Sequence, residues 1–310
     1  MGPDAPGGAL FPEPRREKPP QHLLTRLFLS ERGLRAGWRL LLYAALALLL
    51  NFSFDLLGSL FLDFSRGFTS PPMLSFEEIS GFASVYLAAL LMARLEHRPA
   101  GEYGLPLPRA FSSRFWIGAF LGLCEISLLM GSIALCGGYS FGSLMLRGPL
   151  LVGWACFWMV LFIFVGLYEE FLFRGYTQFT LAEGIGFWPA AILLSLFFGA
   201  VHSWNPGEDW RGMAEIVVTG LVFAFALKRT GNLWLAVGWH ASFDFGETFL
   251  YSVPDSGALF PGHLSNASLH GPVWLTGGAV GPEASVFAFF TMGLSVLVIH
   301  LLYPAQKSST

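Results

Sequence analysis

Residues 149–174 read PLLVGWACFWMVLFIFVGLYEEFLFR, an apolar run that ends in a group of charged side chains. Its first 20 residues, 149–168, contain no Asp, Glu, Lys or Arg. A helix needs about 20 apolar residues to cross the hydrocarbon core of a bilayer. The stretch therefore predicts a membrane-spanning helix, and its charged end is the first place to look for chemistry.

The composition of the whole chain also indicates a membrane protein. Of the 310 residues, 54% are hydrophobic and 13% are charged, about half the charged share of an ordinary soluble domain. This leaves too little charge for a soluble enzyme or a disordered chain. The 18 Lys and Arg are outnumbered by 21 Asp and Glu, so the chain offers no basic excess for nucleic acid. The three cysteines fall in apolar runs and indicate neither a disulfide framework nor a zinc knuckle.

Hydropathy predicts an all-α, polytopic fold of about eight transmembrane helices. The expected spans are residues 37–60, 78–95, 115–136, 150–181, 187–203, 213–228, 232–251 and 284–303. The fourth span is long and carries charge in its middle, whereas the fifth is short. Residues 21–35 have the pattern of an amphipathic helix that lies on the membrane surface.

The distribution of Lys and Arg predicts that both chain termini are cytoplasmic. Basic residues gather in 15–39, in 94–114 and at Lys228 and Arg229, all on one side of the membrane if the spans are correct. Residues 252–283 contain no Lys or Arg and form a Gly-, Ser- and Pro-rich flap that we expect outside. No signal peptide or transit sequence is recognisable, which favours the plasma (inner) membrane of a prokaryote.

Ionisable side chains inside apolar spans are costly, so each is a candidate functional residue. On a helix, Glu170 and Arg174 are four residues apart and share a face, in the favourable order for an ion pair. Glu169 is turned about 100° away and has no partner on its own helix. Glu169 is therefore free to take up a proton, as a general base must be. A purely structural ion pair is an equally good interpretation of Glu170 and Arg174.

Two histidines on other spans complete the candidate site. His202 ends the fifth span, and His240 lies in the seventh, with Asp244 one turn later on the same face. At about 1.5 Å per residue from the cytoplasmic helix ends, Glu169, His202 and His240 lie about 18, 22 and 12 Å deep and are expected to converge. Glu125 in the third span is an unpaired carboxylate at similar depth, expected either to line the cavity or to face another helix in protonated form.

Three short motifs thus follow one another on successive predicted membrane helices. They are Glu169-Glu170-x-x-x-Arg174, Phe198-x-x-x-His202 and His240-x-x-x-Asp244. In this order they resemble the CAAX prenyl endopeptidase and bacteriocin-processing (CPBP, Abi) family of intramembrane proteases. The motif-bearing stretch covers about residues 150–250, a third of the chain. The resemblance implies a conical active-site cavity inside the membrane and hydrolysis of a peptide bond there.

The resemblance also implies roles for these residues. Glu169 and His202 would activate the water that attacks the scissile carbonyl, and His240 with Asp244 would stabilise the oxyanion. The residues that would hold the helices and their electrostatics in place are Glu170, Arg174 and Phe198. Asn is the common alternative at the position of Asp244, and an ionised Asp cannot donate to an oxyanion. Asp244 must therefore be protonated, orient His240 or bind a metal.

The sequence is compatible with a metal-dependent site and with a metal-free one. Metal ligands could come from Glu169, His202, His240 and Asp244, enough for a catalytic Zn²⁺ that keeps a bound water. The chain has no HExxH motif, and the family resemblance admits a metal-free mechanism as well. The expected partners are the lipid bilayer and a membrane-embedded or lipidated peptide or protein. CAAX-box protein processing is one form of this activity, but a CAAX substrate is not implied.

Two other functions compete with an endopeptidase. A non-catalytic scaffold or immunity-type protein would keep the fold, but it has little reason to keep unpaired polar groups in lipid. A proton-coupled transporter is disfavoured by the single charged cluster and the lack of inverted repeats. The predicted organisation is a cytoplasmic tail with a candidate interfacial helix at 1–36, N-terminal transmembrane helices at 37–145, a protease core at 150–250, an external loop at 251–283, and the last helix with a cytoplasmic tail at 284–310.

Overall fold

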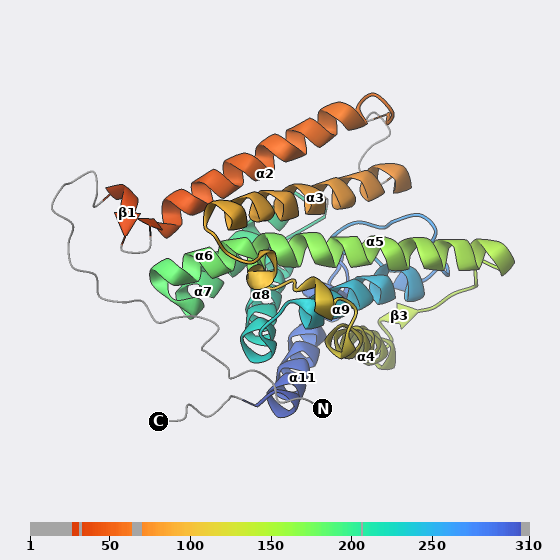
Figure 1. Cartoon of the computed structure of the whole chain (residues 1–310). Helices are drawn as coiled ribbons and strands as arrows, with labels where there is room; N and C mark the ends of the chain where they lie inside the picture. Colours follow the sequence, from red (N-terminus) through yellow and green to blue (C-terminus); the bar gives the residue numbers. More distant parts are fainter. Residues whose placement is uncertain (1–26, 31–32, 64–69, 206, 305–310) are drawn as a thin grey trace.

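The computed structural model describes residues 27–30, 33–63, 70–205 and 207–304 (Figure 1). The long elements are all helices: α2 (Ala36–Gly58), α3 (Pro71–Leu95), α4 (Ser113–Leu135), α5 (Gly148–Arg174), α6 (Tyr176–Ile185), α7 (Phe187–His202), α8 (Trp210–Thr230), α9 (Trp234–Asp244) and α11 (Val286–Leu302). Two short 3₁₀ turns, η2 (Ala100–Tyr103) and η3 (Leu107–Arg109), connect α3 to α4. The predicted all-α, polytopic fold is confirmed.

Among the described residues, five helical segments are long and apolar enough to cross a membrane. They are α2, α3, α4, α8 and the stretch Gly148–Ile185, which contains α5 and α6. The other three predicted spans correspond to shorter helices, α7, α9 and α11. The chain is therefore an integral membrane protein whose helices differ widely in length.

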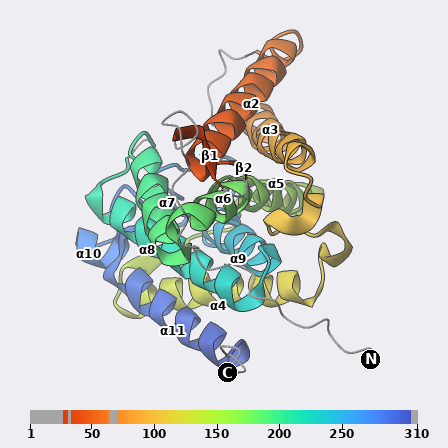
Figure 2. The ribbon, with the colours of Figure 1, turned by 60° about the vertical axis from the view of Figure 1, so that its left-hand side comes forward.

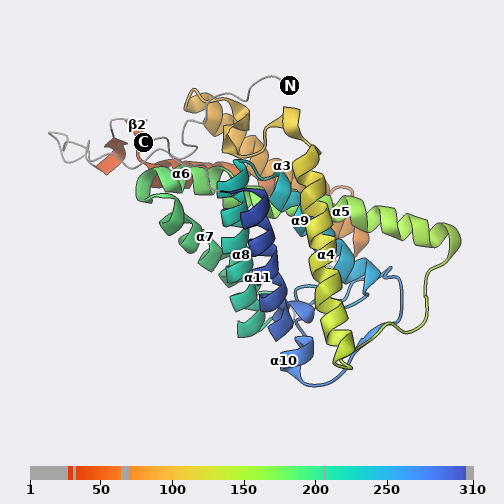
Figure 3. The same ribbon diagram turned by 90° about the horizontal axis from the view of Figure 1, so that it is seen from below.

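The helices form two groups that cross steeply. In Figure 1, α2, α3 and α5 run side by side while α4 is seen nearly end-on. In Figure 3, α4, α8 and α11 run alongside one another and α5 crosses their direction. Helix α9 contacts both α4 and α5, so it joins the two groups (Figure 2). Side chains on α9 can therefore meet side chains on α5, and this meeting point positions the candidate site.

The close packing of α4 against α9 depends on glycines. A Cβ atom at Gly118 would lie 2.0 Å from the carbonyl oxygen of Leu235, and one at Gly238 would lie 2.1 Å from that of Phe115. Gly118 and Gly122 have the G-x-x-x-G spacing that lets membrane helices approach closely. Backbone contact between the helices fixes where the side chains of α9 project.

The predicted fourth span, residues 150–181, is divided at Gly175. Helix α5 ends at Arg174, and α6 begins at Tyr176. A Cβ atom at Gly175 would lie 2.3 Å from the carbonyl oxygen of Phe171, so the chain breaks where only glycine fits. The charged residues consequently lie at the C-terminal end of a helix. Hydropathy had placed them in the middle of one long span, and that expectation is wrong.

The predicted amphipathic helix at residues 21–35 lies largely outside the described residues. Within its described part, β1 (Leu29–Ser30) pairs antiparallel with β2 (Gly33–Leu34). Residues 27 and 28 are helical, as expected, whereas the helix expected at 29–30 and 33–34 is wrong, because these residues pair as two short strands.

Residues 251–283 are folded against the helices. The π-helix η4 (Phe245–Leu250) leads into this loop, and β4 (Ser268–Leu269) within it pairs antiparallel with β3 (Tyr139–Ser140). The short helices α10 (Val273–Thr276) and η5 (Pro282–Ala284) close the loop. Most of this loop has no regular secondary structure, as expected, but hydrogen bonds and burial hold it in a defined position against the helices.

Candidate active site

A cavity of about 570 Å³ lies among the helices. All four residues predicted to be catalytic line it: Glu169, His202, His240 and Asp244. Helix α5 supplies Glu169 and α7 supplies His202. Helix α9 supplies both His240 and Asp244. The convergence expected from their depths is therefore present in the structure, while their catalytic roles stay predictions.

One oxygen of Glu170 joins two helices at the back of this site. Its Oε1 accepts a hydrogen bond from Nη1 of Arg174 at 3.0 Å and lies 3.1 Å from Nδ1 of His240. The Glu170 side chain is 0% exposed and the Arg174 side chain 1%. The predicted ion pair is present, shielded from water, and extended to α9 through the imidazole.

The other ring nitrogen of His240 faces two further carboxylates. Nε2 lies 3.6 Å from Oε2 of Glu169 and 3.5 Å from Oδ2 of Asp244. The Phe223 ring stacks on the imidazole with 5.6 Å between the ring centroids. The Glu169 side chain keeps 23% exposure, so of the two adjacent glutamates it is the one that faces the cavity.

Phe198 connects the buried ion pair to His202. The guanidinium carbon of Arg174 lies 4.3 Å from the centre of the Phe198 ring, within cation–π distance. The same ring meets the His202 ring edge-on at 4.7 Å. Nδ1 of His202 lies 2.8 Å from the backbone oxygen of Phe198 and must donate to it, because a carbonyl oxygen only accepts. The neutral imidazole then carries its free lone pair on Nε2.

Residues 151–246 match a family model, described as type II CAAX prenyl endopeptidase Rce1-like. The matched residues contain all three motifs, the first of which includes the buried ion pair of Glu170 and Arg174. The match covers about a third of the chain, and we refer to these residues as the Rce1-like core. The resemblance to the CAAX protease family is thereby confirmed, and the family is one of proteases. No curated protein and no solved structure matches the chain.

The Rce1-like core shares its cavity with carboxylates that the three motifs do not include. They are Glu78, Glu125, Glu215, Asp255 and Glu283. The first three lie inside apolar helices, so the criterion that identified Glu169 also points to them. The two loop residues follow no apolar pattern, and nothing local in the sequence distinguishes them.

Glu125 lines the cavity and has hydrogen-bond partners on two other helices. Its Oε2 accepts from Nε1 of Trp239 at 2.8 Å and from Oγ of Ser295 at 2.9 Å. The expectation that this carboxylate is unpaired is therefore wrong, because α9 and α11 bring donors that its own helix lacks.

The two loop carboxyls carry shifted pKa values. Burial raises the pKa of Asp255 to about 6, against the opposing effect of the hydrogen bond from Thr248. Burial, and then the nearby Asp255, raise the pKa of Glu283 well above its usual range. In both cases the surroundings disfavour an uncompensated negative charge.

One set of side chains has the spacing of a metal site. Among the described residues, three acids hold ligand atoms that all lie within 4.8 Å of one another: Glu247, Asp255 and Glu283. The four predicted catalytic residues of the Rce1-like core line the cavity without forming such a group. As they are arranged, they do not supply the three converging ligands of a catalytic zinc site. The choice between Zn²⁺ and no metal stays a prediction.

Proposed function

We propose that this protein is an intramembrane endopeptidase that hydrolyses a peptide bond of a membrane-associated protein or peptide. The observation that carries the proposal is the arrangement around Glu169. Its carboxylate faces the cavity and lies 3.6 Å from His240, which the buried Glu170 contacts from behind. A cavity-facing base beside a positioned imidazole suits general acid–base catalysis.

In the proposed reaction, Glu169 removes a proton from a water molecule as the water oxygen attacks the scissile carbonyl carbon. The neutral ring of His202 accepts a hydrogen bond at Nε2 and orients this water. The proton on Glu169 then passes to the leaving nitrogen as the carbon–nitrogen bond breaks. Atoms and protons balance without a cofactor, and the carboxylate returns to its starting state.

We assign the developing negative charge on the carbonyl oxygen to His240. Its Nδ1 is directed to Glu170, which leaves Nε2 as the donor on the cavity side. Oδ2 of Asp244 lies 3.5 Å from Nε2 and can orient the ring, which donates from both nitrogens when it is protonated. Of the three roles open to Asp244, orientation of His240 is thus the one that the distances support. A preorganised donor of this kind is worth about 10²–10³ in rate.

The cavity wall supports a substrate with an apolar segment. Beside the polar groups it is lined by large apolar side chains of α5, namely Trp158, Leu161, Phe162 and Val165. A membrane-embedded or lipidated peptide would place its apolar part here and its scissile bond near Glu169. We further propose that both termini are cytoplasmic, on the distribution of Lys and Arg, and keep the plasma membrane of a prokaryote as the expected location.

The test is a comparison of protein N-termini in membranes from cells that carry the wild type, Glu169→Gln or no copy of the gene. A fourth strain carries Glu102→Gln, which changes a carboxylate outside the cavity whose side chain is 44% exposed. Expression of all variants is matched. N-termini present with the wild type and Glu102→Gln, and missing from the other two strains, support the proposal and identify the cleaved bond.

The opposite result is equally informative. If the wild type and Glu169→Gln give the same N-termini while both rescue the phenotype of the null strain, the peptidase proposal fails. A non-catalytic scaffold that keeps the fold would then take its place.

A further inference from the structure

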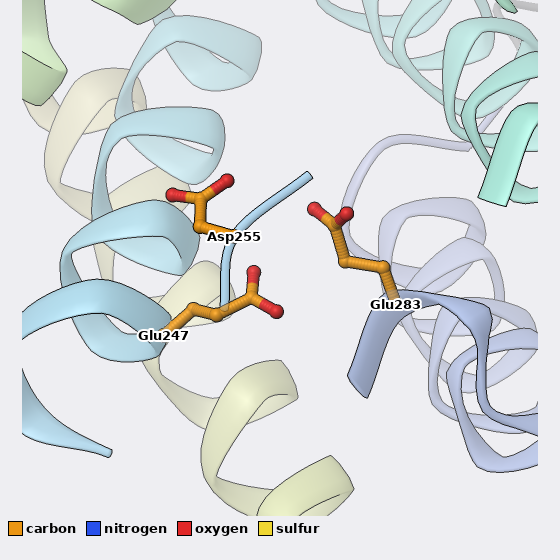
Figure 4. Close-up of side chains that lie close together, drawn as sticks. All are labelled: Glu247, Asp255 and Glu283. Carbon is orange, nitrogen blue, oxygen red and sulfur yellow. The ribbon is translucent and has the colours of Figure 1, made fainter. Parts of the chain in front are cut away.

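Three carboxylates from separate segments meet beside the cavity (Figure 4). Glu247 belongs to η4, Asp255 to the loop segment that follows it, and Glu283 to η5 at the far end of the loop. Their nearest ligand atoms all lie within 4.8 Å of one another. The long loop thus begins and ends at the same small cluster of acids.

Glu247 is an unsatisfied carboxylate inside the protein. It is 0% exposed, and neither Oε1 nor Oε2 has a hydrogen-bond partner. Figure 4 shows its carboxylate directed toward the other two acids. Buried polar groups are nearly always paired, so two unpaired oxygens on one side chain require an explanation. A bound proton or a bound cation would supply it.

The other two acids have partners that occupy only part of their capacity. Oδ2 of Asp255 accepts from Oγ1 of Thr248 at 2.8 Å. Oε2 of Glu283 accepts from the backbone nitrogen and from Oγ of Ser256, both at 3.2 Å. These are neutral donors, and no ion pair recorded among the described residues involves the cluster.

We propose that Glu247, Asp255 and Glu283 bind a divalent cation of the Ca²⁺ type, which joins the two ends of the loop to η4. The site is separate from Glu169, His202 and His240, and the proposal does not depend on the peptidase activity.

The donor atoms decide the class of cation. All three side chains offer carboxylate oxygens, which hard cations such as Ca²⁺ and Mg²⁺ prefer, and none offers nitrogen or sulfur. Two oxygens bound to one Ca²⁺ lie at most about 4.6–5.2 Å apart, twice the Ca–O distance, against about 4.0–4.2 Å for Mg²⁺. Separations of no more than 4.8 Å are closer to the spread of Ca²⁺ ligands than to that of Mg²⁺ ligands, so small side-chain adjustments would complete a Ca²⁺ site.

The backbone around the cluster is closed tightly. The amide of Gly257 donates to the carbonyl oxygen of Val280 at 2.8 Å, which ties the two ends of the loop together. A Cβ atom at Gly281 would lie 2.2 Å from the carbonyl oxygen of Pro254 and 3.4 Å from Oε1 of Glu247. The three acids are thus held near one another by a rigid frame. The loop would therefore lose little conformational entropy when a cation binds.

A cation here would also act on the cavity. Asp255 and Glu283 belong to the cluster and also line the cavity. Ser256, which contacts Glu283, lines the cavity as well. Binding would neutralise two of three negative charges and keep the loop against the helices. The expected consequence is a more stable protein with a fixed cavity wall.

The experiment uses the full-length protein, purified in detergent and treated with EDTA. Titration with CaCl₂, MgCl₂ and MnCl₂ is followed by calorimetry and by thermal unfolding, without substrate. We expect one saturable Ca²⁺ site per chain. The unfolding temperature should rise by about 5–10 °C at a concentration about 100 times Kd. Glu247→Gln should weaken Ca²⁺ binding at least about 10-fold, because it removes one charged ligand.

Glu125→Gln is the matched control, because Glu125 is also a buried carboxylate of the same cavity but lies outside the cluster. It should bind Ca²⁺ as the wild type does. The proposal is overturned if none of the three cations gives saturable binding to the wild type. This result is obtained on the wild-type protein alone and does not depend on whether a variant folds. It is also overturned if Glu247→Gln and Glu283→Gln both bind with unchanged affinity. Because no cleavage is measured, failure here and failure of the peptidase proposal are distinguishable.

Discussion

Oε1 of Glu170 lies 3.1 Å from Nδ1 of His240, so a fully buried carboxylate of α5 holds an imidazole of α9. The preceding residue, Glu169, faces the opposite nitrogen of the same ring from the cavity side. Two glutamates that are adjacent in the sequence thereby have different surroundings. One is enclosed with Arg174, and the other can reach water. Their substitution should have different consequences.

We expect Glu170→Gln to destabilise the fold and Glu169→Gln to leave it nearly unchanged. Loss of the Glu170 charge leaves the buried Arg174 without a counter-charge, which costs about 3–5 kcal/mol of unfolding free energy. Glu169 keeps 23% side-chain exposure, so Glu169→Gln should change the unfolding free energy by less than about 1 kcal/mol. Denaturant unfolding of both variants in the same detergent measures the difference. Equal losses of stability would contradict this assignment.

For Asp244 we expect the amide and the truncation to differ in activity. If Asp244 orients His240, Asp244→Asn keeps a hydrogen-bonding group there and should retain activity within about 10-fold of the wild type. Asp244→Ala removes that group and should lower the rate by about 10²–10³. The rate at which protein-dependent N-termini appear in membranes is the measurement. An inactive Asp244→Asn would instead indicate that the negative charge itself is required.

Phe198→Leu should weaken the connection between Arg174 and α7. The guanidinium loses its cation–π partner and the core loses part of a buried ring, together about 1–3 kcal/mol of unfolding free energy. Phe197→Leu is the matched control, because Phe197 is the preceding residue of α7 and is 59% exposed. Its effect should stay within about 0.5 kcal/mol. A similar effect of both substitutions would argue that general packing of α7, and not the contact with Arg174, matters.

Two glycines of α4 should respond to alanine with opposite sign. Gly118→Ala places a methyl group against the backbone of Leu235 and should lower the unfolding free energy by about 1–3 kcal/mol. Gly131→Ala meets nothing within 4 Å and should raise the unfolding free energy by up to about 1 kcal/mol, because alanine favours the helix. Thermal unfolding of both variants is the measurement. Stabilisation by Gly118→Ala would show that α4 and α9 can separate at little cost.

Much of the helix layout was predictable because hydropathy is a local property. Each of the eight predicted spans contains a helix, with ends that differ by a few residues in most cases. The break at Gly175 was not predicted, because a single glycine in an apolar run is compatible with a continuous helix. It follows from the approach of the Phe171 carbonyl, which depends on the local backbone path.

The candidate site was predictable in its members and less so in its connections. Glu169, His202 and His240 could be found because charged and polar side chains are rare in apolar spans. The sequence did not reveal that the imidazole of His240 lies between Glu169 and Glu170, because α5 and α9 are distant in the sequence. The hydrogen bonds of Glu125 escaped prediction for the same reason, since they come from Trp239 and Ser295.

The sequence by itself determined that this chain belongs in a membrane, where most of its helices lie, and which polar residues they carry. These properties follow from the side chains in a window of about 20 residues and the thickness of a bilayer. Tertiary structure alone decided that Glu170 is enclosed while Glu169 is open, and that the loop acids Asp255 and Glu283 meet Glu247. Burial and proximity are set by packing between segments far apart in the chain, and no local pattern encodes them.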